Sequence, residues 1–199
     1  MSVKFQYNKT SLQNLEKQLK VRERALPTLK NKESALRLEV KKAKDRAHEL
    51  SMMLRDRIAS YDLMVRLWGE FDTSLVKIKD VQLGFKKLAG VNTPTLEHID
   101  FETEPFFIFN HPLWILDGIE LVKELATIAI EQEIFLQKMN LLDHARKKST
   151  QKVNLYEKVQ IPGYHDAIRK IKRFIEDEEN LSKSAQKIVK SRKEQEVAS

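Results

Sequence analysis

The sequence predicts an all-α fold: a long antiparallel two-helix coiled-coil hairpin with a short compact tip in the middle. Three observations predict it. The 199 residues include only 5 Gly and 5 Pro but 33% charged residues, a composition that favours long helices over β-sandwiches. Apolar residues repeat with a period of 3.5 residues along the first part of the chain. A second apolar pattern of helical period follows residue 112.

The first helix is predicted over residues 10–83. Alternating steps of three and four residues from Leu12 give 20 positions, of which 17 are apolar, and a period sustained for that long indicates a coiled-coil seam. Arg22, Glu33 and Arg57 interrupt the seam. Two interpretations are open: these residues pair across the hairpin and fix its register, or they mark contacts with another subunit. At 1.5 Å per residue this helix would be about 100 Å long, so it must project as a shaft.

Residues 84–111 are predicted to form the tip. The segment GFKKLAGVNTPTLEHIDFETEPFFIFN contains two glycines and two of the five prolines of the chain. Its pieces LEHIDFE and FFIFN favour strands and can pair as a small β-hairpin. A turn without β-structure is the alternative interpretation.

The second helix is predicted over residues 112–190, because Pro112 suits a first helical turn and apolar residues then continue at helical spacing. Residues 191–199 are predicted to be a frayed tail, and the whole chain is predicted to be a single elongated domain. The predicted seam consists of Leu12, Leu15, Leu19, Leu26, Leu29, Leu36, Val40, Leu50, Leu54, Ile171, Phe174, Leu181 and Ile188.

The stretch RALPTLKNK places Pro27 inside the first helix, where a proline costs roughly 3 kcal/mol. If the hairpin folds about residue 95, Pro27 lies opposite residue 163, and the second helix has Pro162 and Gly163 at that level. A kink shared by both helices bends the pair without opening its seam. We therefore predict that Pro27, Pro162 and Gly163 form a bend in the shaft.

Charge is distributed unevenly along the chain, which carries a net charge of +7. Residues 1–60 have a net charge of +8, residues 80–135 of −7, and residues 136–199 of +6. The two basic arms are either solvated helix faces or surfaces for an anionic partner, such as nucleic acid, an acidic membrane or an acidic protein socket. There is no signal-peptide pattern and no apolar run long enough to span a membrane, so neither is expected.

No segment carries a recognisable catalytic motif. The chain has no cysteine, which excludes disulfides and Cys-based metal sites. It also has no G-x-x-x-x-G-K-[ST] loop for phosphate, and its five histidines are scattered. The sequence therefore predicts a non-catalytic protein with no catalytic, cofactor-binding or metal residues and no cofactor.

Four segments, spread over roughly residues 10–190, carry a resemblance to a known family. They are SLQNLEKQLKVRERALPTLKNKESALRLEV, AGVNTPTLE, HPLWILDGIE and KVNLYEKVQIPGYHDAIRKIKRFIEDEE. In this order the segments resemble the D subunit of the V-type/A-type ATPase (ATP synthase) family, the central rotor stalk. The last segment is the most recognisable, with V-N-x-x-E followed by IP and an I-x-x-I-K run.

The resemblance implies a rotor shaft that couples ATP hydrolysis or synthesis in a catalytic hexamer to rotation of a membrane ring and transport of protons or sodium ions. The implied partners are the catalytic and regulatory nucleotide-binding subunits of the hexamer, a small globular stalk subunit and a funnel-shaped subunit on the membrane ring, with no nucleic acid. The implied location is cytoplasmic and peripheral to the membrane, in the soluble sector of the complex.

Two other functions are compatible with the residues themselves. A basic helical hairpin can act as a scaffold that binds an anionic membrane surface or nucleic acid. The chain can also form an independent homo-oligomeric coiled coil. Aromatic residues are concentrated near the tip and the seam rather than among the basic residues, which argues against the scaffold.

Overall fold

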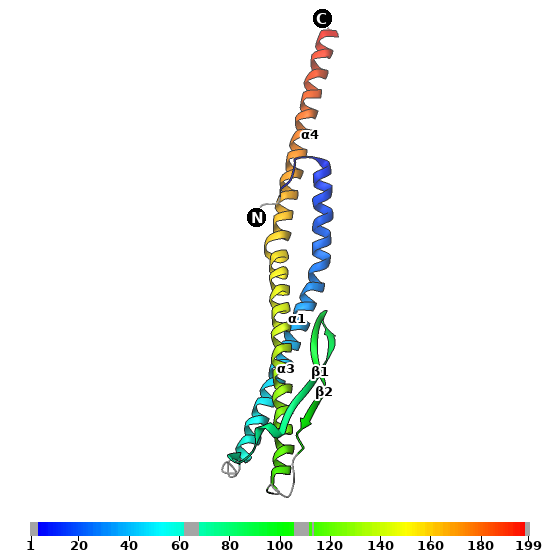
Figure 1. Ribbon diagram of the computed structural model, residues 1–199. Helices are drawn as coiled ribbons and strands as arrows, with labels where there is room; N and C mark the ends of the chain where they lie inside the picture. The colour runs from blue at the N-terminus through cyan, green and yellow to red at the C-terminus, as the bar shows by residue number, and fades with distance from the viewer. Residues whose placement is uncertain (1–3, 62–67, 106–111, 113, 198–199) are drawn as a thin grey trace. The chain divides into compact units, whose positions relative to one another are not determined.

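The computed structural model describes all residues except 1–3, 62–67, 106–111, 113 and 198–199. In the described part of the chain, long helices precede and follow one β-hairpin (Figure 1). The elements in chain order are α1 (Lys9–Ser60), the 3₁₀ turn η2 (Thr73–Leu75), β1 (Val76–Leu88), β2 (Val91–Thr103), α3 (Trp114–Asn154), the π-helical turn η4 (Leu155–Gln160) and α4 (Ile161–Val197). The predicted long terminal helices and a β-hairpin in the middle of the chain are confirmed. The predicted pairing of the strands is not: LEHIDFE lies in β2 and pairs with β1, whereas FFIFN, residues 106–110, lies outside the described residues.

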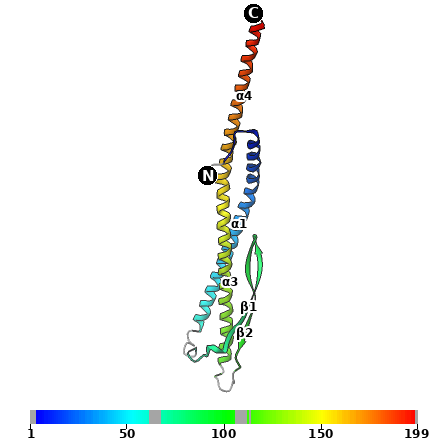
Figure 2. The ribbon, with the colours of Figure 1, turned by 45° about the horizontal axis from the view of Figure 1, so that its top comes forward.

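The chain divides into two compact units. The first consists of residues 1–31 and 149–199, and the second consists of residues 32–148. Within the first unit, the start of α1 and the start of α4 lie side by side and run antiparallel (Figures 1 and 2). Asn8 caps α1, because the Ser11 N–H donates to Asn8 Oδ1 at 2.6 Å and satisfies one of the unpaired donors of the first turn.

The predicted end of the first helix at residue 83 is wrong. α1 ends at Ser60, and β1 begins at Val76. The error arose because Leu75 and Ile78 keep the seam spacing although they lie in η2 and β1. The same stretch, VKIK, also alternates apolar and charged residues with the two-residue period of a strand.

The central hairpin occupies residues 76–103, earlier in the chain than the predicted tip at 84–111. Its antiparallel register shifts twice, once at Lys79 on β1 and once at Glu97 on β2. Each extra residue changes which face the following side chains take. The two shifts together bring the apolar residues to one face: Ile78, Val81, Leu83 and Phe85 from β1, and Pro94, Leu96, Ile99 and Phe101 from β2.

A tight turn at Ala89 and Gly90 closes the hairpin, with φ angles of 48° and 82°. Such left-handed angles at both central residues favour Asn-Gly, whereas alanine in this region costs about 1–2 kcal/mol. We therefore expect Ala89→Asn to stabilise the hairpin by about 0.5–1 kcal/mol, measured as slower amide exchange in β1 and β2. Gly90→Ala is the matched control and should accelerate exchange, and a variant Ala89→Asn that exchanges faster would contradict the turn geometry.

The returning helix also differs from its predicted limits of 112 and 190. α3 begins at Trp114, and α4 continues to Val197 rather than fraying after residue 190. The last turns stay helical because Lys, Arg, Glu and Gln are good helix formers and Lys190 lies 3.8 Å from Glu194, four residues on. None of the helices in the described part of the chain is both long and apolar enough to cross a membrane.

Candidate functional site

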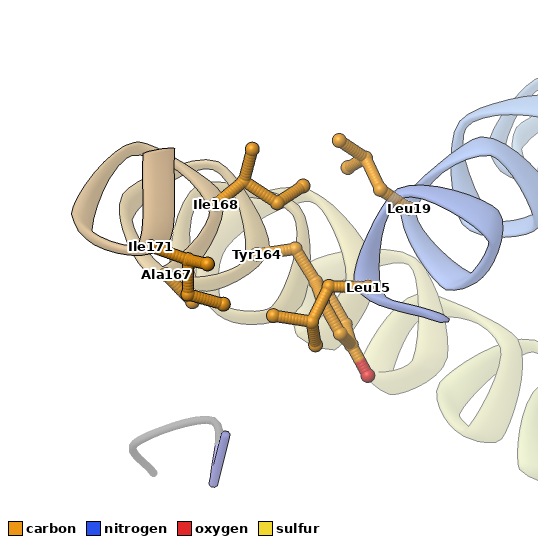
Figure 3. Close-up of a cluster of buried hydrophobic side chains, with 6 residues drawn as sticks. All are labelled: Leu15, Leu19, Tyr164, Ala167, Ile168 and Ile171. Atoms are coloured by element: carbon orange, nitrogen blue, oxygen red, sulfur yellow. The ribbon is translucent and has the colours of Figure 1, made fainter. Parts of the chain in front are cut away.

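An apolar seam holds the antiparallel helix pair of the first unit together. Leu15 and Leu19 of α1 pack against four buried residues of α4, namely Tyr164, Ala167, Ile168 and Ile171. Figure 3 shows the side chains from the two helices facing each other. Burying side chains of this size stabilises the pair by about 1.5–3 kcal/mol each.

The predicted seam positions on α1 face inward to different degrees. Leu15, Leu36 and Leu50 are at most 5% exposed and lie multiples of seven residues apart, so α1 keeps one heptad phase through Pro27. Among the predicted positions on α1, Leu15, Leu19, Leu36 and Leu50 are buried, and Leu12, Leu26, Leu29, Val40 and Leu54 are half-buried. The supercoil itself stays a prediction.

The predicted seam positions on α4 divide sharply. Ile171 is fully buried, whereas Phe174, Leu181 and Ile188 are 44%, 72% and 55% exposed. The predicted packing of Leu181 and Ile188 against the first helix is not seen, because both lie beyond Glu179, which contacts Lys9 at the start of α1. Figure 1 shows α4 continuing past the start of α1. Phe174 instead lies beside the ring of Tyr7, with centroids 4.9 Å apart.

The part of α4 beyond this point, residues 180–197, is named here the terminal segment. Besides Leu181 and Ile188, it exposes Val189 by 55%. A shallow groove runs along it, lined by Ser182, Ala185, Gln186, Val189, Lys190, Lys193 and Glu194. The groove combines the apolar side chains of Ala185 and Val189 with two lysines, and no described residue of α1 lines it.

Four contacts between acidic and basic side chains join α1 to the returning helix. They show which residues of the two antiparallel helices lie opposite each other. We call them the ladder. They are Lys9–Glu179 at 3.3 Å, Glu16–Lys172 at 3.0 Å, Glu23–His165 at 3.3 Å and Lys30–Glu157 at 2.7 Å. Each pair is largely exposed, so each contributes at most about 1 kcal/mol of stability.

The ladder corrects the predicted register at the prolines. Pro27 lies between the ladder residues Glu23 and Lys30, and so faces the π-helical turn rather than residue 163. Pro162 lies three residues before His165, the partner of Glu23, and five residues after Glu157, the partner of Lys30, so it faces residues 25 and 26 of α1. The two prolines are therefore within about 3 Å of each other in height, less than one turn. Both are exposed, and Gly163 is half-buried.

The residues that interrupt the predicted seam have partners within the chain. Arg22 donates to Gln160 across the helix pair at 2.7 Å, and Arg57 lies 2.8 Å from Glu124 of α3. Glu33 pairs with Arg37, four residues on in the same helix, at 2.8 Å. For Arg22 and Arg57 the contacts match the interpretation that they pair across the hairpin.

The aromatic residues expected near the tip lie together in the second unit. Trp68, Phe71 and Trp114 have ring centroids 5.4–6.3 Å apart, and Phe71 and Trp114 pack against the buried cluster Leu75, Ile115 and Ile119. Gly118 lies under this group, since a Cβ there would be 3.1 Å from the Phe71 ring. The cluster forms a local core.

A carboxylate on α3 makes stability depend on pH. Hydrogen bonds from Lys147 and Arg146 hold the pKa of the Asp143 carboxyl below its ordinary value of 3.8. A carboxyl whose pKa is lower in the folded state stabilises the fold fully at pH values above its pKa in the unfolded state. This stabilisation is lost as the pH falls through its pKa in the folded state. Asp143→Asn should lower the unfolding free energy by about 0.5 kcal/mol at pH 7.

The difference between wild type and Asp143→Asn should shrink as the pH falls below about 4, measured as urea midpoints over a pH series. Asp166→Asn is the control, because Asp166 is 65% exposed and lies 3.8 Å from Arg169. A pH-independent difference for Asp143→Asn would contradict the assignment.

Among the described residues, no group of three or more His, Asp or Glu side chains is placed to hold a metal ion. What the molecule offers is a paired shaft, an exposed terminal segment and a half-covered apolar hairpin face on which Phe85 is 76% exposed and Pro94 is buried. The π-helical turn was not predicted from the sequence, because residue spacing alone does not reveal where one extra residue is absorbed.

Comparison with known proteins gives one consistent result. Residues 11–191 match the family model that describes the ATP synthase D subunit. A V-type ATP synthase D subunit from Borreliella burgdorferi is 29% identical over 192 residues, covering 94% of each chain. Proteins with the same name from Chlamydia pneumoniae and Chlamydia muridarum are 27% and 26% identical, covering 89% and 98% of this chain and 87% and 98% of theirs.

Proposed function

This chain belongs to the family of ATP synthase D subunits, and we propose that it is the central rotor shaft of a V-type/A-type ATPase or ATP synthase. In this role it couples ATP hydrolysis or synthesis in a hexamer of catalytic and regulatory nucleotide-binding subunits to rotation of a membrane ring, and thereby to transport of protons or sodium ions. It is a non-catalytic subunit, located on the cytoplasmic face as a peripheral part of the complex.

The terminal segment of α4 is the observation that carries this proposal. Two packed helices resist bending better than one, and the apolar seam at Ile171 holds them together. Beyond the pair, Leu181 and Ile188 present exposed apolar side chains, and a separate shallow groove combines Ala185 and Val189 with polar residues. Contiguous apolar surface with a polar rim is typical of protein interaction sites. In this proposal the terminal segment lies in the axis of the hexamer.

Two further partners are proposed from the family resemblance. A small globular stalk subunit and a funnel-shaped subunit on the membrane ring are proposed to bind the middle of the chain. The hairpin and the aromatic cluster at Trp68, Phe71 and Trp114 lie in this middle part.

The bend at Pro27, Pro162 and Gly163 is also proposed as part of this function. A rotor must present different faces to the surrounding sites, and a curved pair of helices does so where a straight uniform rod does not. The two prolines lie within two turns of each other in height, close enough to curve both helices together. A structure of the assembled complex with both helices straight through Pro27 and Pro162 would refute the bend.

Affinity purification of the native protein from its own cells tests the function. Recovery of a nucleotide-hydrolysing hexamer together with a small second stalk subunit, identified by mass spectrometry, is the expected result. Recovery of anionic lipid or nucleic acid alone would favour the basic scaffold instead, and recovery of only further copies of the chain would favour a homo-oligomeric coiled coil. Either outcome would overturn the proposed role.

A further inference from the structure

The residues of the ladder are not equally spaced on the two helices. On α1 its residues are Lys9, Glu16, Glu23 and Lys30, each seven positions after the last. On the returning helix the partners are Glu179, Lys172, His165 and Glu157, so the steps are seven, seven and eight. The returning helix therefore carries one more residue than α1 between the last two contacts.

The extra residue falls where the backbone changes from α to π geometry. η4 occupies Leu155–Gln160, and the Ile161 N–H donates to the carbonyl of Tyr156, five residues back instead of four. A π turn accommodates one residue more than an α turn and leaves the helix on either side in its original phase. Here the π turn lets Glu157, on one side of it, contact Lys30, while the residues of α4 on the other side still face α1.

Arg22 binds the end of this turn from the opposite helix. Its Nε donates to Gln160 Oε1 at 2.7 Å, and its guanidinium carbon lies 4.6 Å from the centre of the Tyr164 ring and 6.0 Å from that of Tyr156. The arginine is held in turn, because its Nη1 donates to the Gln18 carbonyl at 3.0 Å. Tyr164 is buried and donates its hydroxyl to Gln18 Oε1 at 2.6 Å.

Backbone hydrogen bonding is weakened in both helices at this level. Pro162 lies two residues after the end of the π turn, and Pro27 lies opposite that end. Neither proline has an N–H to donate. Arg22 also occupies the heptad position that holds leucine one heptad before and after it, at Leu15 and Leu29. A polar side chain therefore replaces apolar packing where the two helices differ by one residue.

We propose that the π turn Leu155–Gln160 is a one-residue phase correction that forms a compliant joint in the helix pair, and that Arg22 is the positioning residue that locks it. The lock acts through planar stacking on Tyr164 and a directed hydrogen bond to Gln160, contacts that can break and re-form without moving the apolar seam. The joint is inferred from contacts within the chain and does not depend on the proposed function. It can be tested on the isolated full-length chain.

Arg22→Leu separates a lock from a merely structural contact. Leucine suits the seam, so the thermal midpoint should stay the same or rise, while amide exchange at Tyr156–Ile161 should become at least about tenfold faster. Arg24→Leu, at an exposed position on the same helix, should leave both measurements unchanged. Unchanged exchange at the turn, or a midpoint that falls in step with faster exchange, would overturn the role of Arg22. Arg22→Lys, which keeps the charge but loses the planar fork, should also accelerate exchange.

Single-residue deletions test the phase correction. Removing Lys158 should convert the turn to a continuous α-helix and leave the thermal midpoint within a few degrees, because helix phase on both sides is retained. Removing Lys170, also exposed but in regular α-helix, should turn the chain that precedes it by about 100° relative to Ile171 and lower the midpoint by about 10 °C or more. Equal losses for the two deletions would show that the π turn stores no extra residue.

Discussion

Replacing Ile171 by alanine is expected to lower the free energy of unfolding by about 3 kcal/mol. Ile171 lies on α4 and is fully buried in the cluster that includes Leu15 and Leu19 of α1. Truncation removes its transfer free energy and leaves a cavity, which the two helices close only partly because contacts on both sides of it hold them apart. Urea denaturation followed by circular dichroism at 222 nm measures the change.

Leu181→Ala is the matched control for this prediction. It removes a side chain of the same size from the same helix, but Leu181 is 72% exposed. Exposed substitutions usually change stability by less than about 0.5 kcal/mol. If both variants lost the same stability, burial between α1 and α4 would not be what holds the helix pair together.

The second large effect is expected on assembly rather than on folding. The double variant Leu181→Ser with Ile188→Ser removes the exposed apolar stripe of the terminal segment while leaving the α1–α4 seam intact. Under the proposed function, recovery of the nucleotide-binding hexamer with the tagged chain should fall at least about tenfold, which corresponds to 1.4 kcal/mol or more. Quantitative mass spectrometry of the purified complex measures this recovery.

Lys183→Ser with Lys187→Ser is the control on another face of the same turns, since neither lysine lines the groove. It introduces the same two serines into the same helix, so the loss of helix propensity is similar. Its effect on hexamer recovery should be less than about threefold and should depend on salt, as expected for exposed charges. Equal losses for the two double variants would mean that the apolar stripe has no specific role in assembly.

Much of the fold could be predicted because the period of a helix is visible in the spacing of apolar residues within a single segment. Leu15, Leu36 and Leu50 recur at multiples of seven, and each is buried in the structure. A strand signal was also present in LEHIDFE, and β2 contains that segment. The same reasoning predicted a first helix that continues beyond its observed end at Ser60, because Leu75 and Ile78 fit the helical period although they lie in η2 and β1.

The exposed terminal segment shows the limit of pattern reading at the candidate site. Leu181 and Ile188 have the spacing of seam residues, and spacing alone cannot tell whether a partner helix reaches them. The Lys9–Glu179 contact marks where α1 begins, and this depends on the antiparallel register rather than on either helix by itself.

The sequence by itself determined that this chain forms two long helices and which of their residues have the spacing of a seam. These properties follow from residue spacing along a single helix, which is set by 3.6 residues per turn. The family resemblance came separately, from four segments in a fixed order. Only the tertiary structure decided the register of the helix pair, the end of the seam and the π turn clamped by Arg22. A one-residue phase correction has no signature within one helix, because it is defined by what faces it across the pair.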